Sequence, residues 1–96
     1  MNIFDYKVPD IEEEFTTLFE GKSIKIVRIV SSDNVEPKEY CQDDDEFVVV
    51  LKGAAKLDMD GEIVTLQSGD TLYIPKETKH KVLETQKGTL WLAVHF

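Results

Sequence analysis

Residues 46–75 read EFVVVLKGAAKLDMDGEIVTLQSGDTLYIP, and this stretch decides the fold class. It holds four short runs rich in β-branched and aromatic residues, separated only by turn sequences. Asp60-Gly61 suits a tight hairpin, Ser68-Gly69-Asp70 suits a second turn, and Pro75 ends the last run. Because strands that follow one another this closely leave no helix between them, they pair antiparallel and close into a sandwich or a barrel.

The same pattern extends to both sides of this stretch. Ahead of it, Asp10 is placed to cap a short helix in which apolar residues from Ile11 to Phe19 recur at helical spacing, and Gly21 ends it. We expect one all-β domain, with a short helix in the N-terminal segment 1–22 and a small β-barrel in residues 23–96. The seven predicted strands are 24–30, 46–51, 54–58, 62–66, 71–74, 79–83 and 89–95.

The composition excludes several classes of partner. Lys and Arg total 11 against 19 Asp and Glu, so the 96-residue chain carries a net charge of −8. A field of this sign repels polyphosphate and anionic lipid, and we expect no nucleic acid or membrane partner. The single cysteine, Cys41, permits no internal disulfide, and the first residues lack the basic flank and apolar stretch of a signal peptide. We therefore expect a cytoplasmic protein.

The strand at 46–51 is apolar on both faces. If Glu46 points into the barrel, alternation directs Phe47, Val49 and Leu51 outward, where they need cover. Either a second subunit or the N-terminal segment supplies that cover. We expect a homodimer, because so short a chain has little else to spare.

The segment YCQDDDEFVVVLKG at residues 40–53 resembles the first signature motif of the cupin superfamily. Glu46 and Gly53 match the spacing of that motif, whereas Tyr40 and Gln42 stand where the family has two histidines. The resemblance implies a small, single-domain cupin or jelly-roll β-barrel. It also implies the usual metal site of that family, three histidines and one glutamate, of which this chain keeps only part.

The segment GDTLYIPKETKH at residues 69–80 resembles the second cupin motif. Gly69, Pro75 and His80 match the motif, whereas Glu77 replaces one of its glycines and Glu84 replaces its asparagine. Both motifs therefore agree with the family in spacing.

Strand alternation points to a polar centre independently of this resemblance. If Glu46 and His80 both face one mouth of the barrel, with Tyr40 and Gln42 on the approach, their oxygens and imidazole nitrogen suit a divalent cation. The candidate metal ligands are Gln42, Glu46 and His80, with the Tyr40 hydroxyl as a further one. The candidate metals are zinc, iron, nickel, manganese and copper, although a set this poor in nitrogen binds them less tightly than the usual family site.

Glu46 has two other interpretations, and both stay open. It is either the solvated start of its strand beside the acidic run 43–45, or an inward carboxylate hydrogen bonded directly to His80 without a metal.

Aromatic residues complete the candidate pocket. Tyr73 and Trp91 are placed there as groups that stack on a ligand. His95 shares a strand face with Trp91. It lies outside the barrel if the aliphatic side of that strand faces the core, and it joins the pocket if Trp91 lines it.

Two functions fit these residues. The first is a cupin that binds a small polar molecule through a divalent metal or a metal-like polar centre, with metal-dependent enzyme activity as its extension. The second is a metal-free binding or regulatory module that works through its pocket or its dimer surface.

Overall fold

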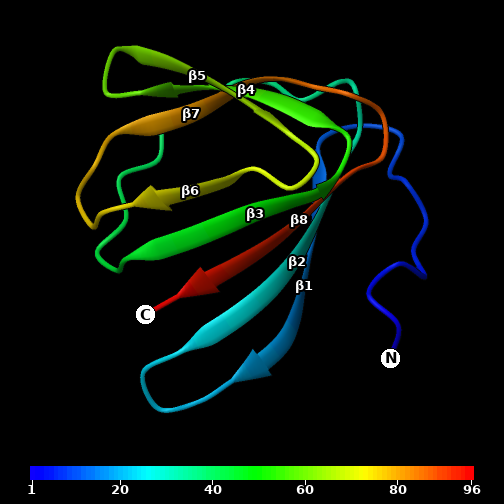
Figure 1. Cartoon of the computed structure of the whole chain (residues 1–96), viewed down its shortest axis with the longest axis horizontal. Coiled ribbons are helices and arrows are strands. Elements are labelled where there is room, and N and C mark those ends of the chain that lie inside the picture. Colours follow the sequence, from blue (N-terminus) through cyan, green and yellow to red (C-terminus); the bar gives the residue numbers. More distant parts are fainter.

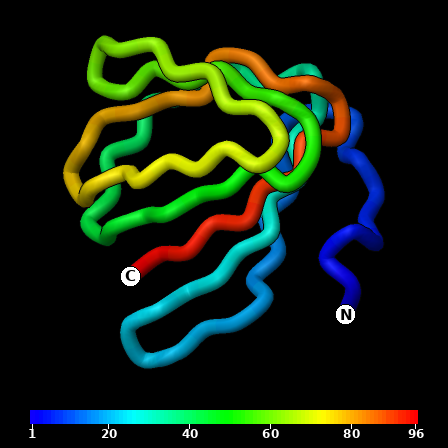
Figure 2. Tube along the Cα trace, viewed as in Figure 1, coloured from blue at the N-terminus to red at the C-terminus, as the bar shows by residue number.

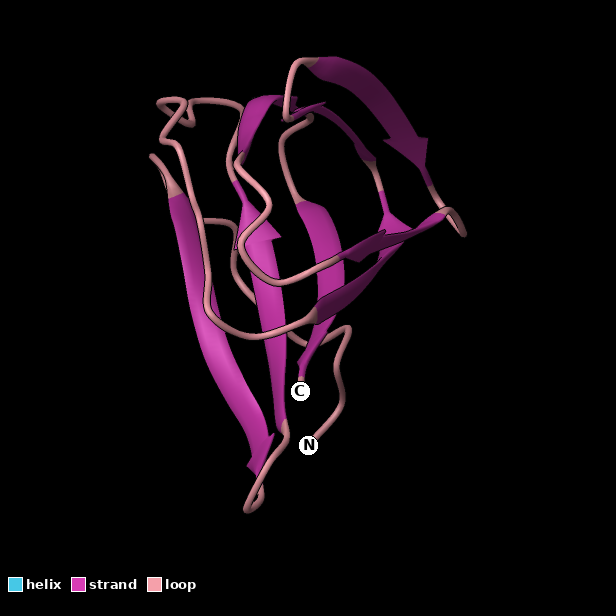
Figure 3. Ribbon diagram, turned by 90° about the vertical axis from the view of Figure 1, so that its left-hand side faces the viewer, coloured by secondary structure: helices cyan, strands magenta, loops and turns pink.

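The computed structural model describes residues 1–96 and contains eight β-strands and no helix. All seven predicted strands are confirmed, each to within two residues at either end. Figure 3 shows only strands and loops, and no helix has the length and apolar character needed to span a membrane. The strands are β1 (Glu13–Glu20), β2 (Lys25–Ser31), β3 (Glu46–Lys52), β4 (Ala54–Met59), β5 (Glu62–Gln67), β6 (Thr71–Ile74), β7 (His80–Thr85) and β8 (Thr89–His95).

The strands form two antiparallel sheets that face each other (Figure 1). The larger sheet has the order β1-β2-β8-β3-β6, and the smaller one has the order β5-β4-β7. From β3 onward the chain passes repeatedly from one sheet to the other, as the trace in Figure 2 shows. This double-sheet arrangement is the jelly-roll type of barrel that the cupin resemblance implied, and it agrees with the sandwich or barrel that the turn spacing predicted.

The predicted N-terminal helix is wrong, because its residues form strand β1. β1 pairs along its length with β2, so that Phe15 lies opposite Ile29, and this pairing gives the outer edge of β2 hydrogen-bond partners. Glu12 has a left-handed φ of 58°, which interrupts any helix that begins at Asp10. The barrel sheet therefore begins within the segment that we had placed ahead of the barrel.

The residues before β1 cross the outer face of the larger sheet. Arg28 of β2 is only 6% exposed, and its Nη1 donates to the backbone oxygen of Asp5 at 3.1 Å. Its guanidinium lies 5.8 Å from the centre of the Tyr6 ring, whose hydroxyl donates to the oxygen of Gly88. The N-terminal segment thus supplies part of the outer cover, beside Arg28.

The core fills the space between the sheets. Side chains from the inward faces of both sheets form one cluster of buried apolar residues. Alternate residues of a strand face opposite sides of the sheet, so polar residues that alternate in step with these apolar ones also point into the barrel. The cluster consists of Val27, Ile29, Val48, Val50, Ala55, Leu57, Leu66, Trp91 and Ala93.

An apolar row crosses the outer face of the larger sheet away from the N-terminal segment. Cross-strand pairing aligns one residue from each of the five strands. Phe47 is 41% exposed and Tyr73 is 50% exposed. The row consists of Phe19, Ile26, Val94, Phe47 and Tyr73.

The homodimer remains a prediction, and this row is where we expect the second copy to bind. Light scattering is expected to give a dimer mass for the natural chain and a monomer mass for Phe47→Lys, because a buried lysine charge opposes association. The control is Ile63→Lys, which places the same charge on an apolar side chain of the other sheet that is 55% exposed. A monomer mass for the natural chain at every concentration from micromolar to millimolar contradicts the prediction.

Gly53 and Gly69 both have a left-handed backbone conformation but differ in the space around them, so they test how much a close backbone contact contributes to stability. Gly53 has a φ of 94°, and a Cβ there would lie 2.9 Å from the Cα of Thr89. Gly69 has a φ of 90° with open space around it. We expect Gly69→Ala to lower the free energy of unfolding by about 1–2 kcal/mol and Gly53→Ala by about 3 kcal/mol or more, measured by chemical denaturation. Equal losses contradict the close approach to Thr89.

Candidate functional site

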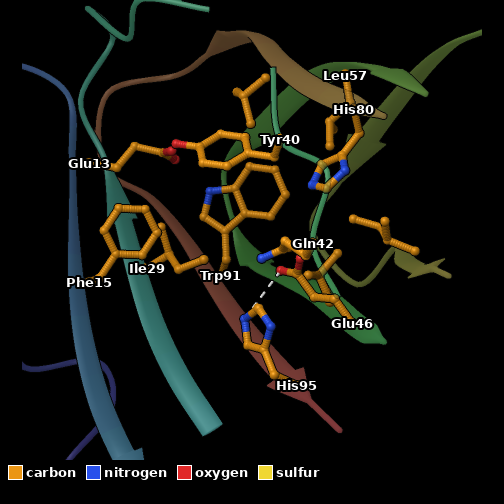
Figure 4. A pocket seen from close by; sticks show the side chains of 13 residues that line it. Glu13, Phe15, Ile29, Tyr40, Gln42, Glu46, Leu57, His80, Trp91 and His95 are labelled. Carbon is orange, nitrogen blue, oxygen red and sulfur yellow. Dashed lines mark ion pairs between the residues drawn. The ribbon is translucent and has the colours of Figure 1, made fainter. Parts of the chain in front are cut away.

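A cavity of about 80 Å³ lies between the sheets. Figure 4 shows the side chains that converge on it from both sheets and from the segment before β3. One part of the wall is apolar and aromatic, and the remainder carries carboxylates, imidazoles and a carboxamide. The lining residues are Glu13, Phe15, Ile29, Tyr40, Gln42, Glu46, Val48, Leu57, Ile74, His80, Val82, Trp91 and His95.

Glu46 is a buried carboxylate of the cavity without a hydrogen-bond donor. Glu46 is the first residue of β3, points inward and is 7% exposed. Residue pairing places it directly opposite His95 of β8, with 3.8 Å between Glu46 Oε2 and His95 Nε2. That distance is longer than a hydrogen bond, and no protein group donates one to this carboxylate. Burial raises the pKa of Glu46 above its ordinary value of 4.5, and the charges of His95 and His80 oppose that rise.

His95 connects the cavity to the surface. Its Nδ1 lies 3.4 Å from Asp44 Oδ2, and Asp44 is partly exposed in the loop before β3. Its other nitrogen faces Glu46, as the dashed line in Figure 4 marks. His95 therefore stands between an outer and an inner carboxylate.

His80 and Tyr40 are held against each other by backbone hydrogen bonds. Tyr40 N donates to His80 O at 2.7 Å, and His80 N donates to Tyr40 O at 2.9 Å. The two rings stack with centroids 5.8 Å apart. His80 Nδ1 lies 2.9 Å from the oxygen of Thr78, and because a carbonyl oxygen only accepts, this nitrogen carries the proton. In the neutral ring the other nitrogen, Nε2, is then an acceptor.

Gln42 has a buried oxygen without a partner. Its side-chain Oε1 is shielded from solvent and accepts no hydrogen bond. Its backbone oxygen accepts from Glu77 N at 2.6 Å, which holds the loop against the turn after β6. Buried polar atoms of this kind are uncommon in folded proteins, and this one lines the cavity, where a bound donor group can reach it.

A second carboxylate faces the cavity from β1. Ser31 donates its hydroxyl hydrogen to Glu13 and accepts the indole N–H of Trp91 at 2.9 Å. Burial raises the pKa of Glu13, although the hydrogen bond from Ser31 opposes that rise. Glu46 is among the charges that raise the pKa of Glu13 further, so the two carboxylates influence each other electrostatically.

Five of the six pocket residues proposed from the sequence line this one cavity: Tyr40, Gln42, Glu46, His80 and Trp91. Tyr73 does not, and its placement in the pocket is corrected. Because it pairs with the outward Phe47, Tyr73 lies on the outer face, donates its hydroxyl to Asp45 at 2.7 Å and stacks on Phe96.

The open question about Glu46 is also decided. It is neither a solvated strand start nor hydrogen bonded to His80, and its nearest imidazole is that of His95.

The acidic residue just before Glu46 differs from it. The hydrogen bond from Tyr73 lowers the pKa of Asp45, which lies at the surface. The acidic run before β3 therefore separates into surface carboxylates and one buried carboxylate.

Two ionisable cavity residues, His95 and Glu13, were not assigned to the pocket from the sequence. His95 had a usable signal, because it shares its strand face with Trp91, and a pocket lined by Trp91 includes His95. Glu13 had none, since its segment was expected to form a helix.

The fold and this cavity define a small double-sheet β-barrel with a polar site between its sheets. Comparison with protein families matches residues 25–95 to the cupin domain. The chain therefore belongs to the cupin family, as its two sequence motifs implied.

Solved structures agree with this assignment. A "putative mannose-6-phosphate isomerase" of Ralstonia eutropha is 33% identical, with a TM-score of 0.87 over 99% of this chain and 94% of that one. An RmlC-like cupin of Shewanella frigidimarina is 18% identical, with a TM-score of 0.79 over 95% and 83% of the chains. KdgF of a Halomonas species is 17% identical, with a TM-score of 0.81 over 95% and 86%. No match is found among curated proteins.

The residues present do not fit the usual metal site of the family. No group of three or more His, Cys, Asp or Glu side chains is placed to hold a metal ion. Tyr40 and Gln42 occupy two histidine positions of the family motif, and a phenol and a carboxamide are weak ligands for transition metals at neutral pH. The predicted ligand set of Gln42, Glu46 and His80 thus provides one imidazole and one carboxylate.

Burial of Glu46 gives a testable dependence of stability on pH. The pKa of Glu46 is higher in the folded chain than in the unfolded chain, where it is near 4.5. The contribution of Glu46 to the free energy of unfolding therefore falls as the pH rises from 4.5 through the folded pKa, and it stays low at higher pH. Glu46→Gln removes this contribution. We expect the variant to gain stability relative to the natural chain as pH rises from acid to neutral, in urea denaturation.

The control for net charge is Glu84→Gln, because the Glu84 side chain is 72% exposed. An advantage of Glu46→Gln that is constant with pH contradicts the raised pKa.

Proposed function

We propose that this cupin binds a small polar molecule in the cavity between its sheets, and that it does so without a metal. The observation that carries the proposal is the buried oxygen of Gln42, which has no hydrogen-bond partner in the protein. Leaving such an atom unpaired costs about 1–3 kcal/mol, and a bound molecule with a donor group removes that cost.

The wall of the cavity supports the same function. Small-molecule sites combine apolar surface with a few convergent polar groups, and here Trp91 and Ile29 line the same cavity as Gln42 and Glu46. The paired backbone hydrogen bonds of Tyr40 and His80 hold two further lining side chains in place. Positions set in this way favour binding, because little freedom is lost when a ligand enters.

The activity named for the Ralstonia eutropha neighbour is not the one we propose here. No Lys or Arg lines this cavity, and Glu13 and Glu46 both face it. A phosphate group would be repelled by these carboxylates and would find no guanidinium or ammonium partner.

Nuclear magnetic resonance tests the proposal with four probes: propylammonium, acetamide, 1-propanol and propionate. We expect at least one of them to shift the indole N–H signal of Trp91, the only tryptophan, and the side-chain amide signals of Gln42. Val82→Phe, which fills the cavity, should abolish these shifts. Leu83→Phe, one residue further along β7 and outside the cavity lining, should leave them unchanged.

Absence of any shift with all four probes contradicts the proposal. Independence from metal is tested separately by elemental analysis of protein purified without a histidine tag, after supplementation with zinc, iron, nickel, manganese and copper. We expect no metal at stoichiometric amount. Stoichiometric metal that is lost on Glu46→Gln or His80→Ala restores the metal-dependent alternative.

A further inference from the structure

We infer that the molecule bound in this cavity is a small organic cation, a primary ammonium group on a short apolar chain. This inference rests on the proposed function and specifies the class of ligand. Three features carry it: a buried carboxylate without a hydrogen-bond partner, three hydrogen-bond acceptors around one cavity, and aromatic side chains in the cavity wall.

The carboxylate of Glu46 is the first feature. Glu46 is 7% exposed as a residue, and its carboxylate accepts no hydrogen bond from the protein. The one ionisable partner within 4 Å of its oxygens is His95, at 3.8 Å, and His95 also faces Asp44 at 3.4 Å. A buried carboxylate is stabilised by an opposite charge with N–H donors, and an ammonium group provides both.

The balance of donors and acceptors is the second feature. Gln42 Oε1 has no donor, and His80 Nε2 is an acceptor in the neutral ring because Nδ1 holds the proton toward Thr78. Together with Glu46, these atoms provide three acceptors around one cavity. An ammonium group has three N–H donors, whereas a carboxylate ligand has none and a hydroxyl has one.

The walls are the third feature. The rings of Trp91, Tyr40 and Phe15 line the cavity, and the faces of aromatic rings attract cations. Glu13 adds a second carboxylate on the β1 side. No Lys or Arg competes for these groups.

The size of the cavity suits a small ligand. Its volume of about 80 Å³ is more than a single water needs, and this suits an ammonium group on a short chain. The net charge of −8 raises the local concentration of small cations around the whole molecule. That general attraction is not specific, so the test must separate it from the cavity.

The experiment compares propylammonium with 1-propanol and propionate, which have the same chain and differ in the polar group. Each is titrated at fixed ionic strength, with sodium chloride matched to propylammonium chloride, and the Trp91 and Gln42 signals are followed. We expect propylammonium to bind with a millimolar dissociation constant, about tenfold or more tighter than 1-propanol, and propionate to bind least.

Two variants distinguish binding in the cavity from the general attraction of cations to the net negative charge of the protein. Glu46→Gln keeps the shape of the side chain and is expected to weaken propylammonium binding about tenfold or more, and to change 1-propanol binding much less because that ligand carries no charge. Glu84→Gln makes the same change in net charge at an exposed position of β7, and we expect it to leave the affinities for propylammonium and 1-propanol unchanged. Thermal melts establish that both variants are folded.

The outcomes distinguish this inference from the proposed function. If 1-propanol or propionate binds as tightly as propylammonium in the cavity, the ligand class is wrong and the binding function stands. If the affinity for propylammonium is unchanged by Glu46→Gln, or if Glu84→Gln lowers it as much as Glu46→Gln does, the cation is held by the net charge of the protein and the inference fails. If no probe shifts the cavity signals, the proposed function fails as well.

Discussion

β8 lies between β2 and β3 in the larger sheet, and its pairing with both strands decides which side chains face the barrel interior. The register that sets Ala93 opposite Val48 also sets His95 opposite Glu46. Because side chains alternate, a shift of one residue would move Trp91 and His95 to the outer face and leave Glu46 inward without its neighbour. The core and the polar site therefore depend on the same hydrogen-bonded pairing.

The cavity places two carboxylates where water is scarce, and the protein accepts an electrostatic cost there. Burial raises the pKa of both Glu13 and Glu46, which means that each ionised group destabilises the fold near neutral pH. Ser31 offsets part of this cost at Glu13, but no donor does so at Glu46. A local arrangement that opposes stability is expected at a functional site rather than in a structural core.

The helix expected near residue 11 shows how a strand can imitate helical spacing. Phe15, Leu18 and Phe19 follow one another at intervals of three and one, as on a helix face. In the structure the pairing of β1 with β2 shifts register between Thr17 and Phe19, so an irregularity at Leu18 breaks the alternation of the strand. Apolar periodicity alone could not separate these two conformations, because the deciding partner is the edge of β2.

The sequence by itself determined the seven later strands, their turns and which residues of each strand share a face, because these depend on neighbouring residues. It also brought Tyr40, Gln42, Glu46 and His80 to one site through the spacing of two motifs. Only the tertiary structure decided that Glu46 faces His95 rather than hydrogen bonding to His80, and that Glu13 closes the site from β1. The reason is that these neighbours are set by register between strands far apart in the chain, and no local pattern encodes such a register.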